Sequence, residues 1–454
     1  MLKKDKKINM IYDATLLANG VTMNSNRTGI YMVVYYLLKA LSKREDTDIT
    51  LYCENTAIND LLIMLKKDFS YKNFKVISDV PVNYITINYG KLKNIRNSLK
   101  EEKRYIAKNI LQLFLIIYSL VYKLTILFHK SNIDCKNYDV YFSPAYVKAK
   151  MFSKKKNIKF YTLLHDTIPL LLTNYHEEAL MEGAWFRVLL DSLNSEDYYI
   201  ANSDQTRKDF LKFYPIIDST KIKTVMLACD EKFKPFDYAS IEKTKEKYNI
   251  QNKKYIFSLC TLEPRKNLIR AVKSFIEFIR KNNIDDLYFV LGGGHWDKFI
   301  GVLESEISDL GLYKDKIIKI GYVEDEDLAP LYSGAEWFVY TSQYEGFGLP
   351  PLEAMSCGCP VITSNNSSLP EVVGDAGIMI DWDSDEQHIK AYEQYYYNKD
   401  LTEENIQKGL ERAKLFSWTK TVNTIVEIMK KDLGYEKSSS VCELQSSELC
   451  KASV

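Results

Sequence analysis

Residues 337–363 read WFVYTSQYEGFGLPPLEAMSCGCPVIT, and this stretch decides the fold. Two short apolar segments, Trp337 to Tyr340 and Val361 to Thr363, have the character of buried strands. Between them, Pro350 and Pro351 suit the first turn of a helix. The stretch therefore predicts a strand, a loop, a helix and a second strand, which is the repeating unit of a parallel sheet.

The same alternation of strand and helix patterns continues through both halves of the chain. In the second half, the other strands that we expect are Tyr255–Leu259, Leu287–Leu291, Ile317–Ile320 and Ile378–Ile380. In the first half, they are Ile8–Asp13, Asp48–Cys53, Tyr138–Phe142, Lys159–Leu164 and Tyr198–Ala201, with a helix over Thr28–Leu41. Regular alternation of this kind predicts an α/β fold with mostly parallel sheets covered by helices.

This pattern indicates two domains. We expect two Rossmann-like, doubly wound domains, residues 1–228 and 229–415, joined through 228–239, which mixes charges with a proline. Residues 416–436 are expected to form a helix that packs back across the domains, and the Ser-rich tail 437–454 is expected to be disordered. Ligands of doubly wound sheets bind beyond the carboxyl ends of the strands, so the expected site is a central cleft between the domains.

Composition limits the possible functions. A length of 454 residues suits two or three domains, and the net charge of +1 provides no overall field that would favour nucleic acid. The eight cysteines are scattered, and the chain opens with MLKKDKK rather than a signal peptide, so a reducing cytoplasm is the expected setting. Cys357 and Cys359 lack a second pair at metal-ligand spacing, so we expect no bound metal.

The loop after residue 340 carries two carboxylates, Glu345 and Glu353, eight positions apart. Gly346 and Gly348 between them allow close approach to a ligand, or backbone conformations that a side chain would forbid. Free N–H groups at a helix start attract anions, while carboxylates accept hydrogen bonds from hydroxyls. A nucleotide sugar contains phosphates flanked by hydroxyl-rich groups, so it is the kind of ligand that these residues would suit. The alternative is a buried turn with Glu353 as an ordinary acid of the first helical turn.

A second candidate segment, Glu263 to Asn267 (EPRKN), follows the strand expected at 255–259. Two adjacent cations at such a turn suit a diphosphate, because Arg265 presents a planar fork and Lys266 a mobile point charge. An exposed pair of this kind can also be an ordinary solvated surface. Residues 292–294 are three glycines without dinucleotide-fingerprint spacing, and we interpret them as a plain turn.

These motifs, together with Phe416-Ser417-Trp418, resemble the retaining glycosyltransferases of family 4, which have the two-Rossmann-domain GT-B fold. The resemblance covers roughly residues 8–434 and is strongest in the second half. It implies transfer of a sugar from a nucleoside diphosphate donor to a hydroxyl, with retention of anomeric configuration and without a metal. The EPRKN and His165-Asp166 patterns resemble bacterial polysaccharide mannosyltransferases. GDP-mannose is therefore the first expectation, while dTDP-rhamnose, GDP-fucose and UDP-sugars stay open.

The resemblance also implies residue roles. Glu345 would contact hydroxyls of the donor sugar, and Glu353 would bind the ribose. Lys266, together with Arg265, would neutralise charge on the leaving diphosphate. The catalytic residues implied are His165, Lys266, Arg265 and Glu345. The donor-binding residues implied are Gly29, Arg27, Phe347, Gly348, Leu349 and Glu353, with no metal ligand. Some relatives carry an arginine where this chain has Cys260, which shifts diphosphate binding toward Arg265 or Arg27.

The first half would supply the facing wall of the cleft. The segment Asn26 to Ile30 leads into a helix, and relatives have a glycine loop at this place, near the diphosphate and the acceptor. The alternative is an ordinary helix start that is capped by Thr28. His165 follows the strand ending at Leu164 and resembles the family's cleft histidine, although a lone histidine is often structural. Asp166 could orient the ring or cap the turn.

Retention allows two mechanisms. A double displacement needs a carboxylate nucleophile, whereas in a front-side reaction the departing phosphate accepts the acceptor's proton. The family resemblance favours the front-side reaction, with Glu345 as a sugar-binding group.

The segment 91–130 has a different character. It contains nine Lys or Arg and two Glu, a local charge of +7, and its stretch 110–128 is almost entirely apolar. A bilayer crossing there would place the strands at 8–53 and 159–201, which should share one sheet, on opposite sides of the membrane. Binding to an anionic membrane surface and burial in a core or subunit contact remain equal alternatives. In either case we expect a cytoplasmic enzyme. If the segment binds the membrane surface, the enzyme would be peripheral at the inner face of the cell membrane and its acceptor could be lipid-linked.

Other functions fit the same motifs less well. A nucleotide-sugar epimerase of similar fold would need no acceptor, and a catalytically silent assembly subunit would bind the nucleotide sugar only. The acidic clusters at 46–48, 325–327 and 381–383 have the form of metal-binding motifs, but we interpret them as turn or helix-cap acids. The oligomeric state, the acceptor and the linkage stay open.

Overall fold

The computed structural model describes residues 6–22, 29–54, 57–78, 92, 112, 116, 119–121, 134–145, 149, 152, 157–174, 180–181, 184–294 and 300–435. Asn26, Arg27 and Thr28 lie outside the described residues, as do most of the segment 91–130 and the tail 437–454. The interpretations that rest on them are therefore not addressed by the structure.

The first domain is built on a parallel sheet of seven strands in the order β3-β2-β1-β4-β5-β6-β7. Its strands are β1 (Ile8–Asp13), β2 (Thr47–Tyr52), β3 (Lys75–Ile77), β4 (Val140–Ser143), β5 (Lys159–Leu164), β6 (Tyr198–Ala201) and β7 (Ile222–Thr224). In the register of β1 against β2, Ile8 pairs with Thr47 and Asp13 with Tyr52. The central strands are buried almost throughout, as expected when helices cover both faces of a parallel sheet.

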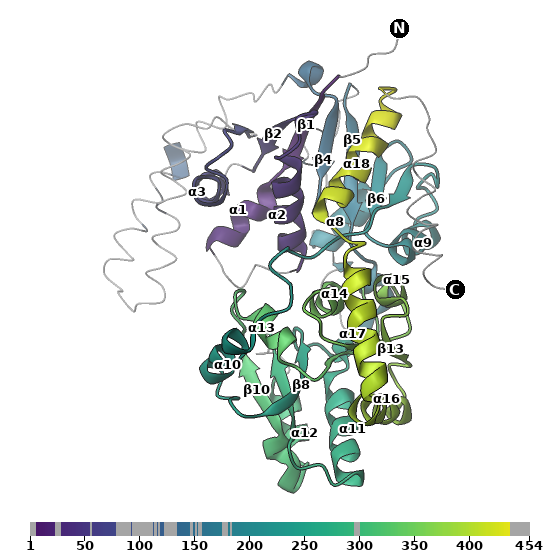
Figure 1. Cartoon of the computed structure of the whole chain (residues 1–454). Helices are drawn as coiled ribbons and strands as arrows, with labels where there is room; N and C mark the ends of the chain where they lie inside the picture. The colour runs from purple at the N-terminus through teal and green to yellow at the C-terminus, as the bar shows by residue number, and fades with distance from the viewer. Residues whose placement is uncertain are drawn as a thin grey trace.

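The second domain repeats this plan with six parallel strands in the order β10-β9-β8-β11-β12-β13. They are β8 (Lys254–Leu259), β9 (Leu287–Gly292), β10 (Ile317–Gly321), β11 (Phe338–Tyr340), β12 (Val361–Ser364) and β13 (Gly377–Ile380). Figure 1 shows the two domains one above the other, with the first domain at the top. The α/β expectation with two parallel sheets is confirmed.

Helices cover both sheets. In the first domain they are α1 (Thr15–Thr22), α2 (Gly29–Leu41), α3 (Ile58–Asp68), η3 (Cys135–Asn137), α6 (Ile168–Leu171), α8 (Trp185–Ser192) and α9 (Asp204–Phe213). In the second they are α10 (Tyr238–Lys247), η5 (Pro264–Lys266), α11 (Leu268–Lys281), α12 (Ile300–Ser308), η6 (Gly311–Lys316), α13 (Leu328–Ser333), α14 (Leu349–Ser356), α15 (Leu369–Val373), α16 (Asp385–Tyr397) and α17 (Lys399–Ala413). α11 illustrates the pattern, because its apolar side chains, such as Phe275 and Ile279, are buried while its last turn ends in Arg280 and Lys281.

The final helix, α18 (Trp418–Asp432), returns from the second domain to the first (Figure 1). The Trp418 ring stacks on Tyr36 of α2 with 5.7 Å between ring centroids. At the other end of the helix, the Tyr161 hydroxyl of β5 donates to Asp432 Oδ2 over 2.8 Å. The helix therefore ties the chain end to the first domain. Among the described residues, no helix is both long and apolar enough to cross a membrane.

The expected strands agree with the observed ones to within two residues at each end, and three of them, β1, β5 and β6, match residue for residue. The two strands that the sequence did not reveal, β3 and β7, are three residues long and lie at the edges of the first sheet. Neither has a continuous apolar run, because an edge strand of a sheet is only partly covered.

Candidate active site between the two domains

The central cluster of the candidate site arises where two neighbouring strands end. β8 pairs with β11, so the turn after β8 lies beside the loop after β11. Lys266 Nζ lies 2.6 Å from Glu345 Oε1, and Arg265 Nη1 lies 3.2 Å from the same oxygen. The Tyr340 hydroxyl, at the end of β11, donates to this oxygen over 3.0 Å. All four side chains are largely withdrawn from solvent; that of Glu345 is 10% exposed.

The charges in this cluster balance. Burial alone would raise the pKa of Glu345, but the nearby charges of Lys266 and Arg265 outweigh it and lower that pKa to about 2. Arg265 Nε is also 2.8 Å from Glu263 Oε2, and despite burial the pKa of Glu263 is lowered by the same two cations. Glu345 is therefore ionised at neutral pH, in an arrangement of two cations and two carboxylates.

Two glycines shape the loop between Glu345 and α14. A Cβ at Gly346 would lie 2.1 Å from the His165 carbonyl oxygen, so this glycine allows the backbones of the two domains to touch. Gly346 therefore permits a close approach to the opposite domain. Gly348 has a φ of 113°, which a side chain disfavours, and it directly precedes α14.

The start of α14 faces the start of α2 across the domain boundary. A Cβ on Gly29 would lie 4.0 Å from Leu349 Cδ1. Pro350 and Pro351 have no N–H, so the free amide donors expected at this helix start are limited to the residues before them. Any anion here would be held by the loop amides up to Leu349 rather than by the whole first turn.

His165 lies at the carboxyl end of β5 and is buried, with Nε2 2.8 Å from the Pro144 carbonyl oxygen. Burial lowers the pKa of His165 to about 4, although the bond to Pro144 opposes this. Since a carbonyl only accepts, Nε2 carries the proton and Nδ1 is left as an acceptor. Asp166 accepts from the Ile168 amide over 3.0 Å, so its carboxylate caps the turn.

Glu353, in α14, has different surroundings. The Tyr332 hydroxyl donates to Glu353 Oε2 over 3.0 Å. Burial raises the pKa of Glu353 to about 7; Asp325 and Asp230 raise it further, whereas Tyr332 and Lys232 lower it. Unlike Glu345, this carboxyl group is bonded to no cation of the described residues, and it changes its charge near neutral pH.

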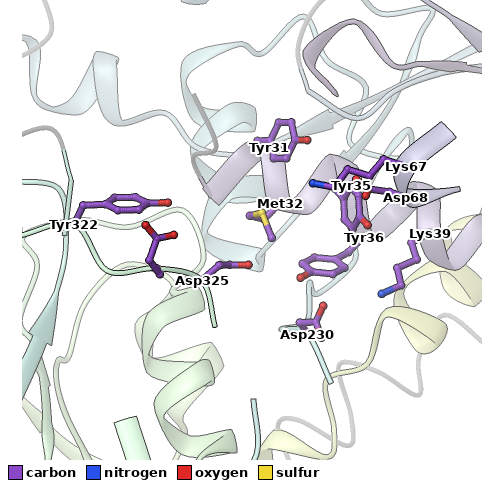
Figure 2. Close-up of a pocket in the computed structure, with 11 residues that line it drawn as sticks. Tyr31, Met32, Tyr35, Tyr36, Lys39, Lys67, Asp68, Asp230, Tyr322 and Asp325 are labelled. Carbon is purple, nitrogen blue, oxygen red and sulfur yellow. The ribbon is translucent and has the colours of Figure 1, made fainter. Parts of the chain in front are cut away.

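A cavity of about 330 Å³ lies between the two domains, and its lining includes Asp230 and Asp325 but neither Glu345 nor Glu353 (Figure 2). α2 contributes three tyrosines, Tyr31, Tyr35 and Tyr36, and the second domain contributes Tyr322 and Asp325. Asp230, from the segment that joins the domains, also lines it, and burial together with this nearby carboxylate raises the pKa of Tyr36. Aromatic rings beside carboxylates suit a ligand with flat faces and hydrogen-bond donors.

The structure brings most, but not all, of the expected residues together. Arg265, Lys266 and Glu345 form one cluster, and the His165 backbone lies against the loop that follows Glu345. The Phe347 side chain is buried and meets Phe416 edge to face, so only its backbone could reach a ligand. Glu353, which is bonded to Tyr332, stands apart from this cluster, and Arg27 lies outside the described residues.

Sequence reasoning missed several side chains of the site. Tyr340 bonds both Glu345 and Lys266, the latter over 2.7 Å, and its position at the end of a predicted strand was the available signal. Tyr332 and Asp230 had no comparable signal, because only the packing of α13 on α14 and the path of the joining segment bring them to the site.

Two of the three acidic clusters, at 46–48 and 325–327, are engaged in ion pairs. Asp325 pairs with Lys232 over 2.5 Å, Asp327 with Lys247, and Asp46 with Arg44. Within the described ranges, no group of three or more His, Cys, Asp or Glu side chains is arranged to hold a metal ion.

Comparisons with known proteins identify the family. The family model described as Glycosyl transferases group 1 matches residues 240–412. The O-antigen chain mannosyltransferase B of Escherichia coli is 35% identical over 272 residues, which cover 58% of this chain and 68% of that protein. The serotype-specific mannosyltransferase WbdA of Escherichia coli is 31% identical over 277 residues, which cover 58% of this chain but only 32% of WbdA.

Solved structures agree on the fold. The crystal structure of Anabaena HepE in complex with UDP and glucose superposes with a TM-score of 0.63 and 14% identity, covering 93% of this chain and 100% of that chain. The chain belongs to the group 1 glycosyl transferases, and it is a glycosyltransferase with the GT-B fold.

Proposed function

We propose that this glycosyltransferase moves a hexose, with mannose from GDP-mannose as the first choice, to a hydroxyl of a saccharide or lipid-linked saccharide. The acceptor would belong to a growing cell-surface polysaccharide. The names of the similar proteins, an O-antigen chain mannosyltransferase and a serotype-specific mannosyltransferase, support this choice. The single observation that carries the proposal is the buried cluster of Glu345, Lys266 and Arg265 at the ends of β8 and β11.

Glu345 would hold the donor sugar. Its bonds from Lys266, Arg265 and Tyr340 all reach Oε1, so Oε2 keeps accepting capacity for sugar hydroxyls. With a pKa of about 2, the carboxylate is always ionised in the cell but weakly basic. This favours a role as a hydrogen-bond acceptor over a role as a nucleophile. Glu353 would accept hydrogen bonds from the ribose at the far end of the loop.

We propose a front-side reaction that retains the anomeric configuration. The bond from the sugar's anomeric carbon to the phosphate oxygen breaks, and the acceptor oxygen bonds to the same face of that carbon. The acceptor's proton passes to the departing phosphate oxygen. Lys266 and Arg265 would stabilise the charge that grows on the diphosphate, which supports chemistry without a metal. The neutral His165 would accept a hydrogen bond at Nδ1 rather than donate a proton.

The test is acceptor-dependent release of nucleoside diphosphate from a panel of nucleotide sugars, with the product's anomeric configuration read by NMR. Retention, release with GDP-mannose and activity in excess chelator are expected. Glu345→Ala should abolish transfer, whereas Asp191→Asn, at an exposed carboxylate of α8, should not. Inversion, or a covalent glycosyl-enzyme trapped on Glu345, would contradict the front-side reaction. Rearrangement of the sugar without any acceptor would indicate an epimerase instead.

Access to a lipid-linked acceptor motivates a second part of the proposal. The basic and apolar segment 91–130 would bind the anionic inner surface of the cell membrane. Flotation with vesicles containing anionic lipid should capture the protein, and neutralising the lysines and arginines of this segment should release it. Equal flotation of the neutralised variant would contradict this part.

A further inference from the structure

The loop that carries Glu345 is fixed from the opposite domain. Ser203 is the N-cap of α9 in the first domain, directly after β6, and Thr206 and Asp209 lie in the first two turns of this helix. Tyr344 and Gly346 flank Glu345 in the loop after β11 of the second domain. We call the contacts between these two groups of residues the α9 clamp. In Figure 1, α9 lies at the lower edge of the first domain, next to α15.

One half of the clamp acts on the residue after Glu345. The Ser203 hydroxyl donates to the Gly346 carbonyl oxygen over 2.8 Å, and Thr206 Oγ1 lies 3.2 Å from the same oxygen. Ser203 and Thr206 are 0% and 2% exposed, so water cannot replace these bonds without separation of the domains. The absence of a side chain at Gly346 permits this contact, since a Cβ would collide with the His165 carbonyl.

The other half acts on the residue before Glu345. The Tyr344 hydroxyl donates to Asp209 Oδ2 over 2.5 Å. Asp209 is buried and also accepts from the Gln205 side chain, through Nε2, over 2.8 Å and from the Thr167 hydroxyl over 3.2 Å. A hydrogen bond to a buried charged group is among the stronger ones in proteins. Glu345 is thus bracketed by two anchors, one residue away on each side.

A third link holds the two domains at the same place. Both carboxylate oxygens of Glu371, in α15, accept backbone N–H groups at the start of α9, from Asp204 and Gln205, each over 2.7 Å. Arg412 fixes α15 in turn, since its Nε donates to the Val372 carbonyl oxygen over 2.6 Å. The loop and the start of α9 are therefore held in a single arrangement.

We propose that Ser203 and Asp209 are positioning residues for sugar transfer: they hold the Glu345 loop in the orientation that the donor sugar requires. This inference rests on the proposed role of Glu345. The clamp makes the sugar-binding carboxylate depend on contact with the acceptor domain. A nucleoside diphosphate without a sugar does not need Glu345, so the clamp affects its binding little.

The test compares Tyr344→Phe and Ser203→Ala with matched controls. Tyr344→Phe removes only the hydroxyl, and Tyr238→Phe, at an exposed tyrosine, is its control. Ser203→Ala also removes a helix N-cap, and Ser384→Ala, which removes the N-cap of α16, is its control. The readouts are kcat for transfer, the dissociation constant for GDP, and the thermal unfolding midpoint.

We expect Tyr344→Phe and Ser203→Ala each to lower kcat about tenfold, while the GDP dissociation constant changes less than about twofold. The double variant should lose at least the product of the two effects, because the loop then has neither anchor. A wild-type kcat in Tyr344→Phe, or a fall in kcat matched by equal weakening of GDP binding, would overturn the clamp. A wild-type chain that transfers no sugar would instead overturn the proposed function.

Discussion

Replacing Lys266 with methionine is expected to destabilise the protein through Glu345. Lys266 Nζ is 2.6 Å from Glu345 Oε1, and the two side chains are 8% and 10% exposed. Methionine keeps most of the lysine stem but removes the charge. Glu345 would then be a buried carboxylate that keeps Arg265 and Tyr340 but has lost its nearest cation, so its lost hydration is less well compensated.

The magnitude follows from the pKa of Glu345. Its ordinary value of 4.5 falls to about 2 in the folded protein. Since a pKa difference of one corresponds to about 1.4 kcal/mol, the ionised form is stabilised by about 3 kcal/mol. This stabilisation is complete above the unfolded pKa and is lost as the pH falls from about 4.5 toward 2. Because Arg265 remains at 3.2 Å, we expect Lys266→Met to cost about 2 kcal/mol, below the usual cost of breaking a buried pair.

Urea unfolding followed by circular dichroism would measure this cost near neutral pH and again at acid pH. The difference from wild type should shrink as the pH falls, because Glu345 in the variant takes up a proton at a higher pH. The double variant Lys266→Met/Glu345→Gln should regain at least half of the loss, since no buried charge is left unpaired. A single variant within about 0.5 kcal/mol of wild type, or a double variant that regains nothing, would refute the reasoning.

Gly346→Ala should lower kcat/KM about 100-fold, because its Cβ would lie 2.1 Å from the His165 carbonyl oxygen and push the domains apart. Gly301→Ala, where a Cβ meets nothing within 4 Å, is the control, and equal activity of the two variants would contradict the steric account. Glu353, with its pKa raised to about 7, should make the wild type lose stability as the pH rises from about 4.5 to 7, whereas Glu353→Gln should show a flatter profile in the thermal midpoint. Identical profiles for the two proteins would count against burial of this carboxyl group. The imidazole of His165, with a pKa lowered to about 4, should stay neutral with the proton on Nε2 from about pH 5.5 to 8 in nitrogen-15 NMR spectra. A titration near pH 6.5 would show that the ring is hydrated rather than buried.

The strands were predictable because a strand buried on both faces is an uninterrupted apolar run. β6 is of this kind, and β5 comes close to it, with only Lys159 at its start and Thr162 breaking the run; the observed limits of both equal the expected ones. β3 and β7 escaped because an edge strand needs no such run: Lys75 begins one, and Lys223 lies in the middle of the other. The pattern of apolar residues therefore predicted the central strands of the first sheet but not its two edge strands.

The core of the candidate site was predictable for a topological reason. In a parallel sheet the carboxyl ends of neighbouring strands share one edge, so Lys266 after β8 and Glu345 after β11 had to lie near each other. Their direct ion pair, and the tyrosine hydroxyl that joins it, depend on side-chain orientation. Sequence spacing has no information about that orientation.

The sequence by itself determined the α/β class, two parallel sheets, and the two turns that carry the charged residues, because local apolar periodicity and turn chemistry encode them. Only the tertiary structure decided how the carboxylates differ. Glu345, paired with two buried cations, is ionised, while Glu353, buried and bonded to the Tyr332 hydroxyl, titrates near neutrality. It also decided that Gly346 touches the opposite domain and that α9 anchors both neighbours of Glu345. The charge state of Glu345 depends on Lys266, 79 positions away, and the domain contacts join residues more than 100 positions apart, and only folding brings such residues together.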